Sequence, residues 1–178
     1  MRSGGGGHLF FALLPDAAAA ARMHGLAGIL KGAHGFDRAP VERDRLHVSL
    51  FFLGLWSERT ARLAREAAAE VRAASFDVLF DRSVSFRGKD GSHPFVLVGD
   101  DGSNPLKCFR QMLGVALTRK GLGSLARGDF TPHVTLLYGA REVDEYPVEP
   151  PIGWRVDEFA LIHSLRGHTH LARWRFDV

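Results

Sequence analysis

Two histidines in the sequence each precede a hydroxyl residue by two positions. His47 is followed by Ser49, and His133 by Thr135, each in an apolar run. Because side chains alternate across a β-strand, the imidazole and the hydroxyl of each pair are expected on one face. An imidazole transfers protons near neutral pH, and a hydroxyl donates hydrogen bonds to anionic oxygens. The two pairs therefore predict acid–base chemistry on a small anion.

The opening of a cyclic phosphodiester by water needs this set of groups. The attacking and leaving oxygens lie roughly in line on opposite sides of the phosphorus, so one side needs a base and the other an acid. His47 and His133 supply these two groups, while Ser49 and Thr135 are predicted to hold the non-bridging oxygens. Such a reaction requires no nucleophilic residue, metal or cofactor.

Chance is the competing explanation for the two triplets. The chain has nine histidines, and about one His-x-Ser/Thr triplet is expected at usual residue abundances. Both triplets, however, have valine in the middle and leucine after the hydroxyl, and both lie on predicted strands. These shared features favour a paired site over two coincidental histidines.

Composition limits the classes of protein to consider. A chain of 178 residues with 46% apolar residues can form a substantial core, and its net charge of +3 suits an anionic substrate. The charges are interspersed, unlike the basic stripe of a dedicated duplex-binding protein. The single cysteine, Cys108, excludes an internal disulfide and a multi-cysteine zinc site, and its place in a predicted helix suggests burial.

The domain organisation is predicted to be simple. Residues 1–7 are expected to be a flexible glycine-rich leader, and residues 8–178 a single domain. No segment has the length and apolar character of a membrane span, and the N-terminus lacks the features of a signal peptide. We therefore expect a cytoplasmic monomer.

Hydrophobic periodicity and turn residues predict an α+β fold. Helices are expected to begin near residues 15, 57 and 104, with the first two ending near residues 30 and 74. A proline-containing connection is expected after Gly139. The order of elements suggests two similar halves, each with one motif strand. The predicted strands are residues 8–14, 46–53, 76–86, 94–98, 131–138, 154–163 and 168–177.

The sequence around both motifs resembles a known family. The chain is similar to the two-histidine (2H) phosphoesterase superfamily, and specifically to the bacterial 2′-5′ RNA ligase family, better described as RNA 2′,3′-cyclic phosphodiesterases. Tandem His-x-Thr/Ser motifs define this superfamily. The segments that carry the resemblance are residues 9–15, 45–54, 130–136, 151–154 and 159–165.

The resemblance implies a fold, an activity and roles for four residues. The fold would be a bilobal α+β domain, with two pseudo-symmetric lobes of mainly antiparallel sheet around a central cleft. The substrates would be RNA ends or nucleotides with a 2′,3′-cyclic phosphate, hydrolysed to the 2′-phosphate, with weak reversible 2′-5′ ligation in some members. By position, His47 would be the proton donor, His133 the proton acceptor, and Ser49 and Thr135 the phosphate-binding residues.

Two departures from the family pattern leave the substrate open. Ser49 stands where threonine is more common, and Tyr138 stands where many members have arginine. A tyrosine can donate a hydrogen bond or stack on a base, but it carries no positive charge. The alternatives are a phosphodiesterase for another cyclic phosphate, such as an ADP-ribose derivative, and a non-catalytic module that binds RNA ends or nucleotides.

Other residues that attract attention are predicted to be structural. His163, His168 and His170 lie near the terminal hairpin, but no carboxylate or cysteine completes a set of ligands, so no metal site is predicted. Phe10, Phe11 and Trp154 could form a wall for a base, although core packing is the favoured interpretation.

Overall fold

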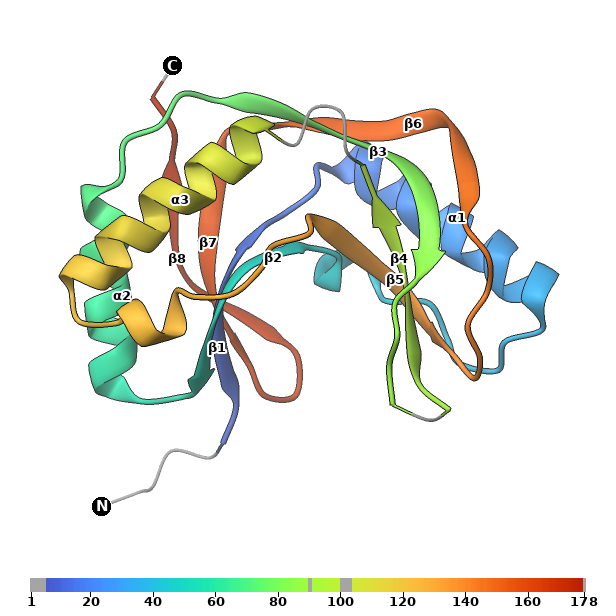
Figure 1. Cartoon of the computed structure of the whole chain (residues 1–178), viewed down its shortest axis with the longest axis horizontal. Helices are drawn as coiled ribbons and strands as arrows, with labels where there is room; N and C mark the ends of the chain where they lie inside the picture. The colour runs from blue at the N-terminus through green and yellow to red at the C-terminus, as the bar shows by residue number, and fades with distance from the viewer. Residues whose placement is uncertain (1–5, 90, 100–103, 178) are drawn as a thin grey trace.

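The computed structural model describes residues 6–89, 91–99 and 104–177, which form an α+β fold with three α-helices and one eight-stranded sheet (Figure 1). The helices are α1 (Ala17–His34), α2 (Glu58–Glu70) and α3 (Asn104–Arg119). The strands are β1 (His8–Leu13), β2 (Val48–Leu55), β3 (Phe76–Ser85), β4 (His93–Val98), β5 (His133–Gly139), β6 (Tyr146–Val156), β7 (Glu158–Ser164) and β8 (His168–Arg175).

The sheet consists of two halves with one narrow connection. Its strand order is β6-β3-β4-β5-β2-β1-β7-β8, and every paired neighbour is antiparallel. We call β5, β4, β3 and β6 the β5 half, and β2, β1, β7 and β8 the β2 half. Between the halves the register consists of one pair, Val48 with Val134. The expected α+β fold with two lobes of antiparallel sheet is confirmed.

The two halves do not follow the order of the chain, contrary to the prediction. β7 and β8 come last in the sequence, yet β7 pairs with β1 and completes the β2 half. Helix α1 follows β1 but packs against β5 and β6 of the other half, as Figure 1 shows. The order of elements could not reveal this exchange, because strand pairing depends on contacts between distant segments.

Helix boundaries follow capping groups and glycine. Asp16 caps α1 by accepting a hydrogen bond from the Ala19 amide at 2.7 Å, and Ser57 caps α2 by accepting one from the Thr60 amide at 3.0 Å. Helix α1 continues past the predicted end near residue 30 and stops at Gly35, whose φ is +64°. Helix α2 ends at Glu70, four residues earlier than predicted.

The expected proline-containing connection is instead strand β6. This strand contains Pro147, Pro150 and Pro151 and pairs with β3 from Phe76 to Ser83. Proline cannot donate a ladder hydrogen bond, so it is normally confined to edge strands, and β6 is at the edge of the sheet. The prediction was wrong because the sequence does not show which strand forms an edge.

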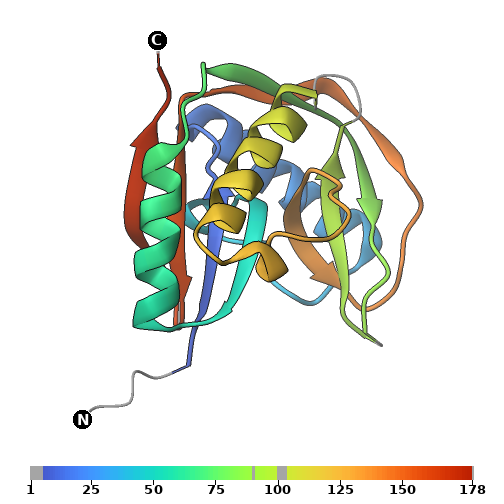
Figure 2. The ribbon, with the colours of Figure 1, turned by 60° about the vertical axis from the view of Figure 1, so that its left-hand side comes forward.

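The two faces of the β2 half carry different clusters of side chains. Leu9, Phe11 and Leu13 face the main core, and Figure 2 shows α2 and α3 beside this half. Phe10 and Ala12 form a small cluster with Ala160 and Ile162. The side chains of β1 therefore alternate between the main core and this smaller cluster. No helix within the described residues has the length and apolar character needed to cross a membrane.

Candidate active site

The narrow connection of the sheet brings both motifs together. His47 directly precedes β2, His133 is the first residue of β5, and each is followed by a valine of the Val48–Val134 pair. When this antiparallel register is continued by one residue each way, His47 stands opposite Thr135 and Ser49 stands opposite His133. Directly opposed residues share a face of a sheet, so the two imidazoles lie diagonally with a hydroxyl beside each.

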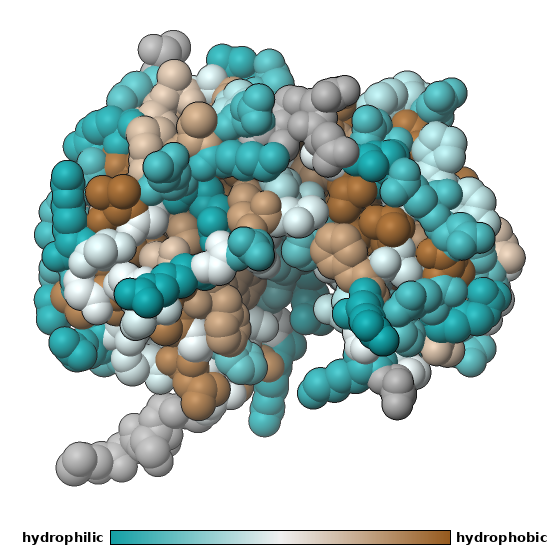
Figure 3. All heavy atoms as spheres, viewed as in Figure 1, coloured by the Kyte–Doolittle hydropathy of each residue, from teal (hydrophilic) through white to brown (hydrophobic). Residues whose placement is uncertain are grey.

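A cleft of about 620 Å³ contains all four predicted residues. His47, Ser49, His133 and Thr135 line it, while Val48 and Val134 are fully buried. Figure 3 shows the surface hollowed between the two halves of the molecule. The alternation predicted from the sequence therefore directs both imidazoles and both hydroxyls into one space.

Both imidazoles are oriented in the same way. The Nδ1 atom of His47 lies 2.7 Å from the Arg45 carbonyl oxygen, and the Nδ1 atom of His133 lies 2.8 Å from the Thr131 carbonyl oxygen. Because a carbonyl oxygen only accepts, Nδ1 is assigned the proton in each ring. The Nε2 atoms are then the positions that exchange a proton with a ligand.

Each imidazole also contacts the ring of a phenylalanine. The ring of His47 lies 5.0 Å from that of Phe10, and the ring of His133 lies 4.9 Å from that of Phe86, measured between centroids. Phe10 is only 7% exposed, so the prediction of core packing is confirmed. Its edge nevertheless forms part of the support for His47, a role that sequence reasoning missed.

The surroundings of His47 contain two further polar groups. Its Nε2 atom lies 3.1 Å from Ser49 Oγ, and its ring centroid lies 5.1 Å from that of His168. Burial is the largest influence on the pKa of His47 and lowers it; the Arg45 carbonyl raises this pKa in part, and the charges of His133 and Arg45 lower it. The uncharged imidazole of His47 is thus favoured in the free protein.

His168 is a third imidazole in the cleft. It lines the same space as His47 and His133, and its Nδ1 atom is buried with no hydrogen-bond partner among the described residues. Burial, followed by the charge of His47, lowers the pKa of His168 to about 4. His168 is therefore neutral near pH 7 and does not compete with the other two histidines as a proton carrier.

Glu42, Arg45 and Tyr138 complete the polar lining of the cleft. Arg45 supplies a positive charge that Tyr138, in the position where many family members have arginine, cannot supply. Sequence reasoning did not select Arg45, Phe86 or His168. Arg45 had one available signal, its place two residues before His47, whereas Phe86 and His168 reach the cleft through strand pairing.

The histidines of the terminal hairpin have separate surroundings. The ring centroid of His163 lies 4.7 Å from that of Trp56 in a tilted arrangement, and His170 Nδ1 lies 2.6 Å from an Arg173 nitrogen. Only His168 of this group lines the cleft. In residues 6–89, 91–99 and 104–177, no three His, Cys, Asp or Glu side chains are placed to hold a metal ion.

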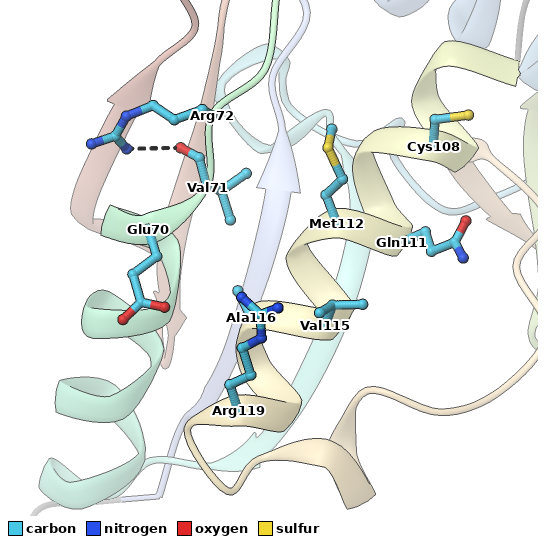
Figure 4. A pocket seen from close by; sticks show the side chains of 9 residues that line it. All are labelled: Glu70, Val71, Arg72, Cys108, Gln111, Met112, Val115, Ala116 and Arg119. Atoms are coloured by element: carbon cyan, nitrogen blue, oxygen red, sulfur yellow. Dashed lines mark hydrogen bonds between the residues drawn. The ribbon is translucent and has the colours of Figure 1, made fainter.

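A second groove lies between α2 and α3 and has no histidine in its lining (Figure 4). Its volume is about 440 Å³, and Cys108 is exposed at its edge. The prediction that Cys108 is buried was wrong. The apolar stripe of α3, formed by Leu106, Phe109 and Leu113, faces the core, and Cys108 falls outside that stripe.

Comparison with known families shows to which family this chain belongs. The model of the 2′-5′ RNA ligase superfamily matches residues 14–168, which include both motifs. The chain belongs to this superfamily. Members of this superfamily are two-histidine phosphoesterases.

Solved structures support this assignment across nearly the whole chain. Escherichia coli LigT in its apo form is 25% identical with a TM-score of 0.78, covering 98% of this chain and 100% of LigT. LigT complexed with 3′-AMP is also 25% identical, with a TM-score of 0.74 and the same coverage. The protein TT0787 of Thermus thermophilus, at 19% identity, shares the fold with a TM-score of 0.71, over 95% of this chain and 97% of TT0787. No curated protein matches the sequence.

Proposed function

We propose that this superfamily member hydrolyses RNA or nucleoside 2′,3′-cyclic phosphates to 2′-phosphates without a metal. The observation that carries the proposal is the diagonal arrangement of His47, His133, Ser49 and Thr135 in one cleft. Two proton-transfer groups on either side of an anion, with a hydroxyl beside each, match the in-line displacement that opens a cyclic phosphate.

The two histidines divide the proton transfers. His133 Nε2 accepts a proton from the water that attacks phosphorus, and His47 Nε2 donates a proton to the 3′ oxygen as its bond to phosphorus breaks. Ser49 and Thr135 donate hydrogen bonds to the non-bridging oxygens as their charge increases. The oxygen of water therefore ends in the new phosphate hydroxyl. His133 then releases its extra proton to solvent and His47 takes one up, which returns both residues to their starting states.

The electrostatics of the cleft are consistent with these roles once the substrate is bound. Burial lowers the pKa of His47 in the free protein, which opposes a proton donor at that position. A cyclic phosphate carries one negative charge, and an anion beside an imidazole raises its pKa. Arg45 lines the same cleft and provides a fixed positive charge for the phosphate.

The same displacement accounts for weak ligation when a hydroxyl group takes the place of water. If the 5′-hydroxyl of an RNA end replaces water, the same groups join it to the cyclic phosphate and form a 2′-5′ bond. LigT has been solved in complex with 3′-AMP and in complex with ATP, so that protein binds nucleotides. We therefore extend nucleotide binding to this chain as part of the proposal.

The decisive experiment is hydrolysis of nucleoside 2′,3′-cyclic phosphates in the presence of a chelator, with the product isomer identified by phosphorus NMR. We expect the 2′-phosphate, and a loss of at least about 100-fold in both His47→Ala and His133→Ala. Loss of wild-type activity in chelator, restored by a divalent ion, would contradict the metal-free reaction.

The same assay separates the alternatives. Turnover of an ADP-ribose derivative that carries a cyclic phosphate, in preference to RNA-type substrates, would identify another cyclic phosphate as the substrate. Binding of nucleotides by folded wild-type protein without turnover of either class would identify a binding module.

A further inference from the structure

An exposed aromatic pair lies outside the lining of the cleft. Phe52 of β2 is 58% exposed, and its ring centroid lies 5.2 Å from that of His8, at the start of β1. A single exposed phenylalanine carries little information, because apolar atoms make up much of any protein surface. A functional role for this pair is indicated by its position relative to His47 and His133.

Strand pairing places Phe52 on the same face of the sheet as the cleft. Phe52 is the partner of Phe10 in the β1–β2 ladder, and opposed residues share a face. The ring of Phe10 contacts those of both His47 and His168. Phe52 follows Ser49 by three residues along β2, which corresponds to about 10 Å. The aromatic pair therefore continues the surface that begins at the histidines.

A β-bulge is responsible for this orientation. Strict alternation from Ser49 would direct Phe51 to the cleft face and Phe52 to the core. The register instead shifts between the Phe11–Phe51 and Ala12–Ser49 pairs, so both Leu50 and Phe51 are buried. Bulges of this kind re-aim side chains next to active sites.

Arg110 of α3 stabilises the bulge from the opposite face. Its Nε atom donates a hydrogen bond to the Leu50 carbonyl at 2.9 Å, and its guanidinium lies 4.3 Å from the ring centre of Phe51. The buried Phe51 and the satisfied Leu50 carbonyl together hold the register that exposes Phe52. The exposure of Phe52 is thus a consequence of specific packing.

We propose that Phe52 and His8 form a stacking platform for the base of the nucleotide next to the one that carries the cyclic phosphate. This inference rests on the proposed function and narrows its substrate to RNA ends rather than free nucleotides. Bases of any sequence have an aromatic face, and proteins bind single strands by stacking them on such side chains. An imidazole beside the phenylalanine widens the aromatic surface.

The sizes of the cleft and of the platform select this occupant. A cleft of about 620 Å³ is in the range that holds one small ligand such as a single nucleotide, so a second nucleotide must lie beyond its lining. Two rings form too small a patch for a stable protein interface, which buries roughly 800 Å² on each partner. A neighbouring base is a ligand of suitable size and chemistry.

The test compares kcat/KM for a cyclic mononucleotide with that for a short oligonucleotide ending in a 2′,3′-cyclic phosphate. Wild type should favour the oligonucleotide. Phe52→Ala should lower kcat/KM for the oligonucleotide about tenfold, and far more than for the mononucleotide, while Phe52→Trp should retain the preference. Leu79→Ala removes a 43% exposed apolar side chain from β3 and serves as the matched control.

Two outcomes would overturn the platform without affecting the proposed function: a wild type that shows no preference for the oligonucleotide, or equal losses for both substrates in Phe52→Ala. If wild type hydrolyses neither substrate, the proposed function fails. The stacking platform is then tested separately, by measuring the binding of an oligonucleotide. Fluorescence anisotropy of a labelled oligonucleotide with a 2′-phosphate end should then show about tenfold weaker binding by Phe52→Ala, and unchanged binding would refute it.

Discussion

The two motif strands, β2 and β5, have closely similar backbones and different surroundings. In each, the imidazole Nδ1 contacts the carbonyl oxygen two residues earlier, at 2.7 Å for His47 and 2.8 Å for His133. Each ring also contacts one phenylalanine at nearly the same distance, 5.0 and 4.9 Å. The local symmetry of the site therefore includes the orientation of the proton-transfer groups.

The difference lies in what else touches each ring. His47 has Ser49 Oγ at 3.1 Å from its Nε2 atom and His168 beside it, and burial lowers its pKa. His168 comes from β8, a strand that only the β2 half contains. The two motifs thus orient their imidazoles alike, whereas the neighbours of the rings differ, and burial favours the uncharged form of His47 in the free protein.

The strongest test of the paired site is a double-mutant cycle on His47 and His133. Each alanine substitution is expected to lower kcat by at least about 100-fold, and the double substitution should cost little more, because one proton-transfer group cannot compensate for the other. Rates are measured by single turnover, with circular dichroism to verify folding. A loss in the double variant equal to the product of the two single losses would show that the two histidines act independently.

Removing the hydroxyls should have the next largest effect. Ser49→Ala and Thr135→Val are each expected to lower kcat by about 100-fold, the usual cost of one donor to a developing oxyanion. Only Ser49→Ala should also shift the pH dependence, since Ser49 touches His47 Nε2. Identical pH profiles for the two variants would show that Ser49 does not influence the titration of His47.

The pH profile tests the assignment of roles with a smaller effect. A proton donor must be protonated, so activity falls as pH rises through its pKa. Burial lowers the pKa of His47 below about 6.5 in the free protein, and the bound anionic phosphate raises it again. NMR titration of the His47 ring should therefore give a pKa below about 6.5 in the free protein and a higher pKa with a bound phosphate. A pKa of His47 that does not rise on phosphate binding would contradict its role as the proton donor.

The smallest expected effect concerns the connection between the halves. Arg110 lies between Phe51, next to the β2 motif, and Phe130, just before the β5 motif, with 4.3 and 4.4 Å to the ring centres. Arg110→Met keeps the apolar stem but loses the guanidinium, and should lower the free energy of unfolding by about 1–2 kcal/mol. Urea denaturation measures this change, with the exposed Arg59→Met as control. An unchanged midpoint would show that Arg110 does not tie the strands together.

Local patterns in the sequence predicted the site better than the topology. The pairing of imidazole with hydroxyl depends only on alternation along a strand, and all four predicted residues line the cleft. The helix caps at Asp16 and Ser57 are similarly local. The proline-containing part of β6 was missed, because its prolines are compatible with a strand only at the edge of a sheet, and an edge is a property of the whole sheet. The predicted strand 154–163 is in fact the end of β6 followed by β7.

The amino-acid sequence by itself determined the chemical groups of the site, their shared face on each motif strand, and the family to which the chain belongs. The tertiary structure decided that the last two strands join the first, that His168, Phe86 and Arg45 surround the histidines, and that a bulge exposes Phe52. The physical reason is the distance along the chain over which each kind of interaction acts. Side-chain alternation has a period of two residues and is encoded within each strand, whereas strand order and bulges follow from the packing of distant segments against one another.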